Sequence, residues 1–216
     1  MGIWWGNFGV KLKKILLFAF GIFLVVFASL SFAQGGNVIM TKDPSAIYFV
    51  LGKYYFSNND FVKASHFFER AVEINPDFAE AHHNLGITYY KLNRDDNAII
   101  ELGEAIGLKN DYAKAYYSMA LIYYEHKDYE NAIRSFLKVV QLDPNNANAN
   151  FDLAVVYAEK FRGKELGGSI NSDDLSDLKE ALKYYLEVID IDSNFPHALS
   201  NAEIIKNIIK IYEQEA

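Results

Sequence analysis

Two pairs of adjacent residues have the types that catalytic or metal sites use, but their spacing argues against such a site. His82 and His83 are neighbours in a helical pattern. Their side chains therefore point about 100° apart and cannot bind one metal ion together. Ser65 and His66 are also adjacent on a predicted helix, where consecutive side chains do not face each other. The sharp strand-to-helix turn that exposes a nucleophilic serine is absent as well.

The composition excludes several other kinds of chemistry. An acidic run over residues 171–177 has the makings of a calcium loop, but Leu175 takes a ligand position and the central Gly is missing. Without any cysteine, the chain has no disulfide, no thiol nucleophile and no Cys-based zinc site. Its formal charge of -7 argues against a nucleic-acid binder. We therefore expect no enzyme, no cofactor and no bound metal.

Residues 1–33 form a segment of their own. Three lysines within 11–14 precede an apolar run over 15–30. The small residues Ser31 and Ala33 follow this run, at the two positions that a signal peptidase recognises. This order predicts a secretory signal peptide that is cleaved after Ala33, leaving a periplasmic or secreted protein. A helix over 15–33 would also be about 28 Å long, so an uncleaved inner-membrane anchor is the alternative. In both cases the lysines stay cytoplasmic and the rest of the chain is exported.

The exported part repeats itself every 34 residues. The first copy contains Tyr48, Leu51, Gly52, Tyr55, Ala64, Phe68, Ala71 and Pro76. Similar residues recur 34 and 68 places later, and a fourth copy has 15 extra residues between its halves. Spacings of three and four place the large residues on one helix face, and the small residue at Gly52 lets a second helix approach. Asp60 and Asp128 are expected to cap second helices.

This pattern resembles the tetratricopeptide repeat, whose signature is a large residue, Leu-Gly, Tyr, Ala, Phe and a late Pro over 34 positions. The resemblance covers residues 45–195 and implies an all-α fold, a right-handed α-solenoid of helix-turn-helix repeats. The predicted parts are a signal peptide or anchor (1–33), a linker (34–44), four repeats (45–78, 79–112, 113–146 and 147–195) and a C-terminal capping helix (196–216).

The family lines a concave groove mainly with the first helix of each repeat, and this implies which residues bind a partner. The implied residues are Phe49, Lys53, Phe56, His83, Ile87, Tyr90, Tyr117, Leu121, Tyr124, Phe151 and Val155. We expect these positions not to be needed for repeat stacking, so that their apolar side chains mark a binding site. The alternative is that some of them pack against neighbouring repeats.

These features predict a non-enzymatic scaffold or adaptor of the bacterial envelope. Its partner would be a protein or peptide that presents an apolar or aromatic peptide or helix, because the Lys and Asn clamp with which some relatives hold a terminal carboxylate is absent. Two alternatives stay open. The chain could be a structural subunit that self-associates through its terminal helix and convex face, or an accessory module that binds cell-wall glycan. Membrane contact is expected only through residues 15–33, and only if this segment is not cleaved.

Two further segments interrupt or end the array. Residues near 161–175 form an insertion in the fourth repeat, which is either a tolerated surface loop or a partner contact. The helix over 196–216 should face the fourth repeat with Ile205 and Ile209 and leave Ile204 on an adjoining stripe. That stripe is either part of a broad buried face or a contact with a second copy.

Overall fold

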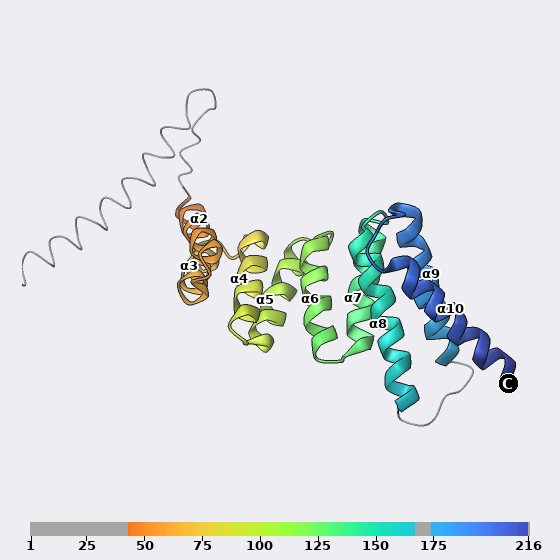
Figure 1. Ribbon diagram of the computed structural model, residues 1–216. Helices are drawn as coiled ribbons and strands as arrows, with labels where there is room; N and C mark the ends of the chain where they lie inside the picture. Colours follow the sequence, from red (N-terminus) through yellow and green to blue (C-terminus); the bar gives the residue numbers. More distant parts are fainter. Residues whose placement is uncertain (1–42, 167–173, 216) are drawn as a thin grey trace, which may run out of the picture. The chain divides into compact units, whose positions relative to one another are not determined.

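A computed structural model describes residues 43–166 and 174–215. The predicted signal or anchor, almost all of the linker and the centre of the insertion lie outside these ranges. The described residues form nine α-helices and no strand, which confirms the all-α prediction (Figure 1). The helices are α2 (Pro44–Ser57), α3 (Phe61–Ile74), α4 (Ala79–Lys91), α5 (Asp95–Leu108), α6 (Ala113–Glu125), α7 (Tyr129–Leu142), α8 (Ala147–Leu166), α9 (Asp174–Ile191) and α10 (Ala198–Glu215). Among them, none combines the length and apolar character needed to cross a membrane.

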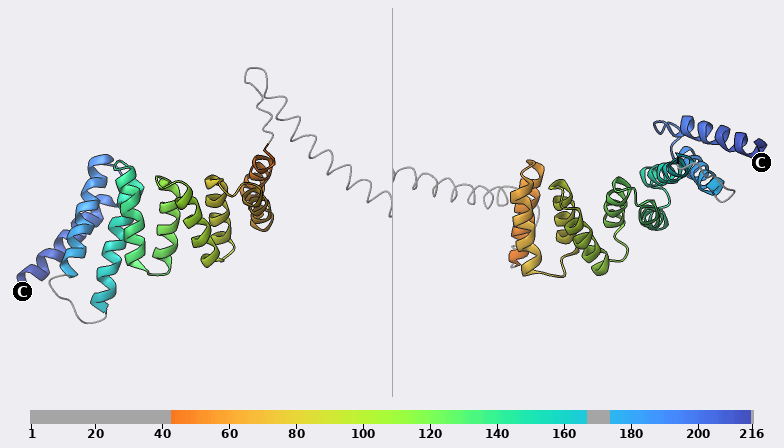
Figure 2. Two further views of the ribbon diagram at one scale, coloured as in Figure 1. Left: turned by 180° about the vertical axis from the view of Figure 1, so that it is seen from behind. Right: turned by 90° about the horizontal axis from the view of Figure 1, so that it is seen from below.

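The helices pack as a row of pairs. α2 packs on α3, α4 on α5, α6 on α7 and α8 on α9. The second helix of each pair then packs against the first helix of the next, and α10 closes the row on α9. Figure 2 shows this order from two further sides. The predicted α-solenoid of helix-turn-helix repeats is confirmed.

Acidic side chains begin two of the second helices, as the sequence predicts. The Asp60 carboxylate accepts a hydrogen bond from the backbone N–H of Lys63 at 3.1 Å. The Asp128 carboxylate accepts one from the backbone N–H of Asn131 at 3.2 Å. Each bond satisfies a backbone donor that has no partner within the helix.

The turn between the two helices of a repeat depends on one residue with left-handed backbone geometry. That residue is Asn59 (φ 59°), Asn93 (φ 56°) or Lys127 (φ 59°), each 34 positions after the last. The fourth repeat has Phe161 at this position, and bulky residues rarely adopt positive φ. Helix α8 accordingly continues through Phe161 to Leu166. The interruption in the fourth repeat therefore begins later than the predicted boundary near 161.

Small residues let the two helices of a repeat approach closely. A Cβ atom placed on Gly52 would lie 2.6 Å from the Phe68 ring, and one on Gly86 would lie 2.8 Å from Leu102. The equivalent residues Ala120 and Ala154 are fully buried. The small position of the repeat is thus explained by helix packing.

Two buried polar side chains hold the connections between repeats. The Asn150 amide donates to the Pro144 carbonyl at 3.0 Å, and His82 Nε2 lies 3.0 Å from the Pro76 carbonyl. His82 Nδ1 also lies 2.7 Å from a Glu101 carboxylate oxygen. These contacts explain why polar residues occupy a repeat position where the first copy has a tyrosine.

We expect Glu101→Gln to lower the free energy of unfolding by about 1–2 kcal/mol at about pH 5.5 and by less at about pH 8. The hydrogen bond with Glu101 raises the pKa of His82. The folded chain then keeps the His82 proton at pH values where the unfolded chain has lost it. The stabilisation is complete below the unfolded pKa and is lost as the pH rises through the folded pKa. Urea unfolding at both pH values measures it.

The matched control is Asp95→Asn, which removes an ion pair with the exposed His126 side chain. Exposed pairs contribute little, so this change should cost less than about 0.5 kcal/mol at either pH. An equal loss at both pH values for Glu101→Gln would contradict the role assigned to His82.

Candidate binding surface

The predicted binding residues all lie on the first helices of the repeats. We call the surface formed by α2, α4, α6 and α8 the A-helix surface. These helices are neighbours, because α4 contacts both α2 and α6, and Tyr117 of α6 donates a hydrogen bond to Asp152 of α8. Lys53 is exposed, His83 is buried, and the other predicted residues are half-buried. The structure brings them onto one surface, and their role in binding stays a prediction.

Three of the predicted rings pack against the connections between repeats. Their ring centroids lie 4.7 Å apart for Phe49 and Phe78, 5.0 Å for His83 and Tyr112, and 5.1 Å for Phe151 and Phe195. Each partner directly precedes or lies near the start of the next first helix. The expectation that these positions are not needed for stacking was therefore wrong for these three. Burial also lowers the pKa of His83, so its ring is neutral at pH 7.

Tyrosine hydroxyls bind acidic side chains on the next first helix. Tyr117 donates to the Asp152 carboxylate, and Tyr90 donates to the Glu125 carboxylate. The Tyr117 ring also meets Phe136 edge-on at 5.5 Å. Burial raises the pKa of Asp152, and burial with the Glu125 bond raises the pKa of Tyr90 to about 12. The sequence placed Glu125 at a groove position but did not predict its bond to Tyr90, and it did not point to Asp152. Each acid follows its tyrosine by 35 residues, one position beyond the repeat.

Apart from Lys53, the remaining predicted residues form what we call the apolar strip. Its members are Phe56, Ile87, Leu121, Tyr124 and Val155, all half-buried. Ile87, Leu121 and Val155 share one repeat position, and Phe56 and Tyr124 share another. The remaining residue, Lys53, places its ammonium 5.6 Å from the Phe49 ring centroid. The strip therefore offers partly accessible apolar area on each of the four first helices.

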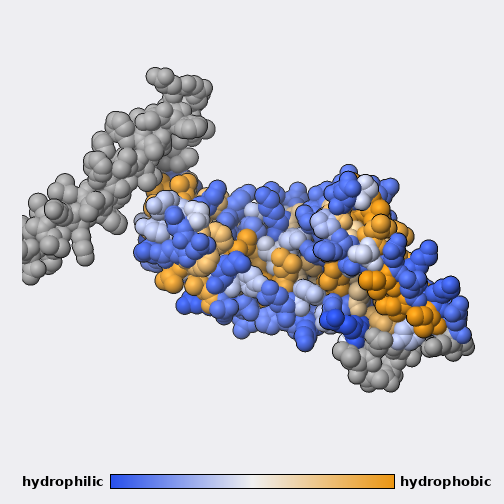
Figure 3. Space-filling view, viewed as in Figure 1, coloured by the Kyte–Doolittle hydropathy of each residue, from blue (hydrophilic) through white to orange (hydrophobic). Residues whose placement is uncertain are grey.

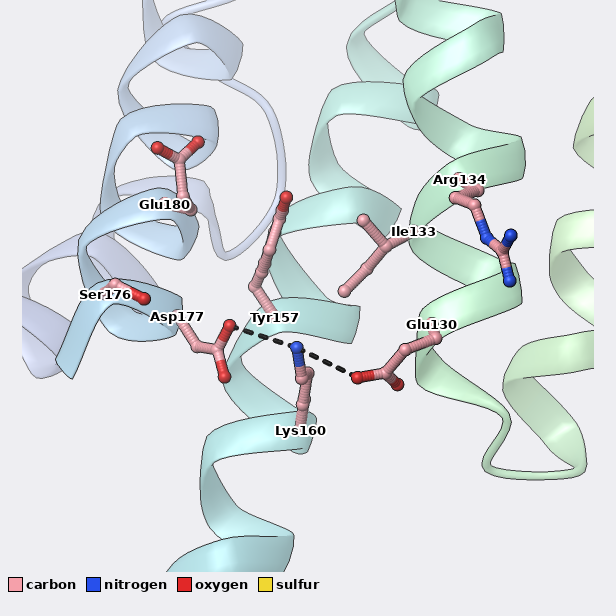
Figure 4. Close-up of a pocket in the computed structure, with 8 residues that line it drawn as sticks. All are labelled: Glu130, Ile133, Arg134, Tyr157, Lys160, Ser176, Asp177 and Glu180. Atoms are coloured by element: carbon pink, nitrogen blue, oxygen red, sulfur yellow. Dashed lines mark ion pairs between the residues drawn. The ribbon is translucent and has the colours of Figure 1, made fainter. Parts of the chain in front are cut away.

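A pocket that the sequence did not predict lies between α7, α8 and α9. It has a volume of about 560 Å³, and Figure 4 shows Lys160 between two of its carboxylates. Lys160 Nζ lies 3.1 Å from a Glu130 oxygen and 3.4 Å from an Asp177 oxygen. These ion pairs join three helices, which gives the charged lining a structural role. Over residues 43–166 and 174–215, no three His, Asp or Glu side chains gather closely enough to hold a metal ion.

Family models match much of the array. A model described as TPR repeat matches residues 52–93 and 120–160, and one described as tetratricopeptide repeat matches residues 79–112. Together these matches include parts of all four helix pairs. No curated protein sequence matches the chain.

Solved structures share the architecture at low sequence identity. A MamA protein is 21% identical, with a TM-score of 0.65 over 79% of this chain and 85% of that chain. PilF of Pseudomonas aeruginosa is 20% identical, with a TM-score of 0.61 over 78% and 70%. YrrB, described as a TPR protein with an unusual peptide-binding site, is 21% identical, with a TM-score of 0.59 over 76% of each chain.

At such identity the solved structures establish the fold alone. The fold, however, agrees with the two family models and with the 34-residue period of the helix pairs. On these three grounds, the chain is a tetratricopeptide repeat protein.

Proposed function

We propose that the chain is a non-catalytic scaffold that binds an apolar or aromatic peptide or helix on its A-helix surface. The apolar strip carries this proposal. Large apolar side chains recur on four neighbouring helices, and they are half-buried in the chain alone. Contiguous apolar surface is rare on soluble proteins unless a partner covers it. Side-chain packing in the strip, rather than capture of a terminal charge, would then hold the ligand.

Two solved repeat proteins support a peptide as the ligand. YrrB is described as having an unusual peptide-binding site. The first TPR domain of Spaghetti (RPAP3) was solved with the HSP90 peptide SRMEEVD; it is 20% identical, with a TM-score of 0.53 over 57% of this chain and 98% of that domain. The same fold therefore accommodates peptides in other proteins. In this chain, we propose that the side chains of the apolar strip contact the peptide.

The place of action that we propose is the bacterial envelope. The support is the sequence of residues 1–33, with its lysines, apolar run and small residues before Gln34. N-terminal sequencing of the mature protein separates the two modes of export. A chain that begins at Gln34 has been cleaved, whereas an intact N-terminus in the membrane fraction indicates an anchor.

We expect the double change Ile87→Gln and Leu121→Gln to weaken peptide binding by about tenfold or more, because buried apolar anchors dominate such interfaces. A displayed random-peptide library selected on residues 34–216 should yield peptides rich in aromatic and aliphatic residues. Fluorescence anisotropy with the selected peptides then measures the affinity for each variant. Circular dichroism of the variants verifies that both remain folded.

The control is Ile100→Gln, which changes an exposed isoleucine on α5, outside the A-helix surface. Its affinity should equal that of the unaltered chain. Selected peptides without apolar residues, or equal affinity for the strip variant and the control, would refute binding on the strip.

A further inference from the structure

The first helix of an inner repeat packs on the preceding repeat through its third and tenth positions. The third positions of the second, third and fourth repeats are Ala81, Ala115 and Ala149, and the tenth positions are Thr88, Ile122 and Val156. All six are at most 1% exposed. These two positions are therefore where one repeat covers the next.

In the first repeat the same positions carry large apolar side chains that are accessible. Ile47 at the third position is 57% exposed and Tyr54 at the tenth is 60% exposed. Val50, one turn from each, is 55% exposed. The spacings of three and four residues place the three side chains on one side of α2. We call this surface the α2 face.

The α2 face lacks the polar character of a terminal cap. At the opposite end of the described row, α10 has the exposed Glu203 and Lys206 at the positions that face the second helix in the other repeats, although Leu199, Ile204 and Ile211 are exposed as well. Polar ends of this kind keep repeat arrays soluble. Figure 3 shows that hydrophobic surface nevertheless remains at both ends of the array, including the end formed by α2 and α3. The α2 face thus has the chemistry of an interface.

The preceding sequence does not supply a further repeat to cover this face. The stretch 34 residues before α3 covers 27–40 and contains two consecutive glycines. Gln34 and Asn37 stand where α3 has the buried Phe68 and Ala71. The pattern of a second helix is therefore absent, and the cover is best sought in another chain.

We propose that the α2 face pairs with the α2 face of a second copy, with a two-fold axis beside Val50. Ile47 lies three residues before Val50 and Tyr54 lies four residues after it. Antiparallel pairing therefore places Ile47 against the partner subunit's Tyr54, and Val50 against the partner subunit's Val50. This arrangement buries the α2 face of both copies in one interface. Because both copies use the same surface, the assembly stops at a dimer and forms no filament.

The charges of α2 permit such an approach. The helix has one charged residue, Lys53, which lies about 90° around the helix from the centre of the α2 face. The charges of α2 itself are then not opposed across the two-fold axis. Three side chains from each copy bury less than the roughly 800 Å² per partner of a standard interface, so the dimer dissociates on dilution.

A single introduced cysteine tests this geometry. The chain has no native cysteine, so Val50→Cys carries the only thiol. A disulfide requires Cα atoms within about 7 Å, which the two-fold axis provides at this residue. The control, Ile100→Cys, is similarly exposed on α5. We expect Val50→Cys to form a covalent dimer at least tenfold faster on mild oxidation. Equal rates would overturn the proposal.

Sedimentation equilibrium of the cysteine-free chain gives an independent readout. Residues 44–216 form a unit with their own core, so residues 34–216 suit the experiment. The mass should rise with concentration towards that of a dimer, and Ile47→Lys with Tyr54→Lys should remain monomeric. A constant monomer mass up to about 1 mM would overturn the proposal. Cross-linking of Val50→Cys in residues 34–216 but not in the full chain would also overturn it, because residues 1–33 would then cover the α2 face. These outcomes are independent of peptide binding on the apolar strip.

Discussion

Replacing Phe136 by Ala is expected to lower the free energy of unfolding by about 3–5 kcal/mol. Phe136 lies on α7 and is fully buried. Its ring meets Tyr117 edge-on, and it belongs to a cluster that includes Leu153 of α8 and Ile205 of α10. Removing the ring therefore leaves a cavity where the third repeat, the fourth repeat and the terminal helix share one core. Urea unfolding measures the loss.

The neighbouring substitution Leu137→Ala is the control, because that side chain is exposed on the same helix. It should cost less than about 1 kcal/mol. Each repeat contacts only its neighbours, so Phe136→Ala should also speed hydrogen exchange first in α6, α7 and α8. A loss equal to that of the control, or exchange accelerated uniformly along the array, would contradict this assignment.

The repeat period made most of the fold predictable. Helix faces, small contact positions and acidic caps are local properties, and each recurs in phase, so Gly52, Phe68 and Asp60 could be assigned from spacing alone. The structure confirms the Asp60 cap and the close contact of Gly52 with Phe68. Local chemistry and packing agree at these positions, which is why the sequence specifies them.

The binding surface was less predictable, because the spacing of side chains on one helix face does not show which other residues pack against that face. Phe49 and Phe151 lie on stripes that could face solvent, yet each contacts a ring in the following connection between repeats. Only the path of that connection brings the ring within reach. In the third repeat the connection has Asn146 in the corresponding place, and Tyr117 contacts Phe136 and Asp152 instead.

In the fourth repeat, too, sequence spacing did not reveal a packing contact, here at the start of the insertion. Sequence alignment with the other repeats placed the interruption near residue 161, where a turn residue is expected. Phe161 instead continues helix α8, is almost completely buried, and meets the ring of Tyr212 edge-on at 5.7 Å. Residue 212 lies on α10, about 50 positions later in the chain. The extended part of α8 therefore supports the terminal helix.

Replacing Phe161 by Ala is expected to lower the free energy of unfolding by about 3 kcal/mol. Because its ring packs on Tyr212, the loss should be accompanied by faster hydrogen exchange in the second half of α10. Urea unfolding and hydrogen exchange measured by mass spectrometry give the two quantities. Ala202 and Ile205 hold the first half of α10 in the same cluster, so that half should keep most of its protection.

The control is Arg162→Ala, since the Arg162 side chain is exposed and forms an ion pair with Glu159 on its own helix. Exposed pairs of this kind contribute little, so stability should change by less than about 0.5 kcal/mol. If both substitutions had the same small effect, Phe161 would behave as a loop residue, as the repeat alignment implied. A large effect of Phe161→Ala alone would show that the residue that prevents the turn in the fourth repeat also anchors the helix that ends the array.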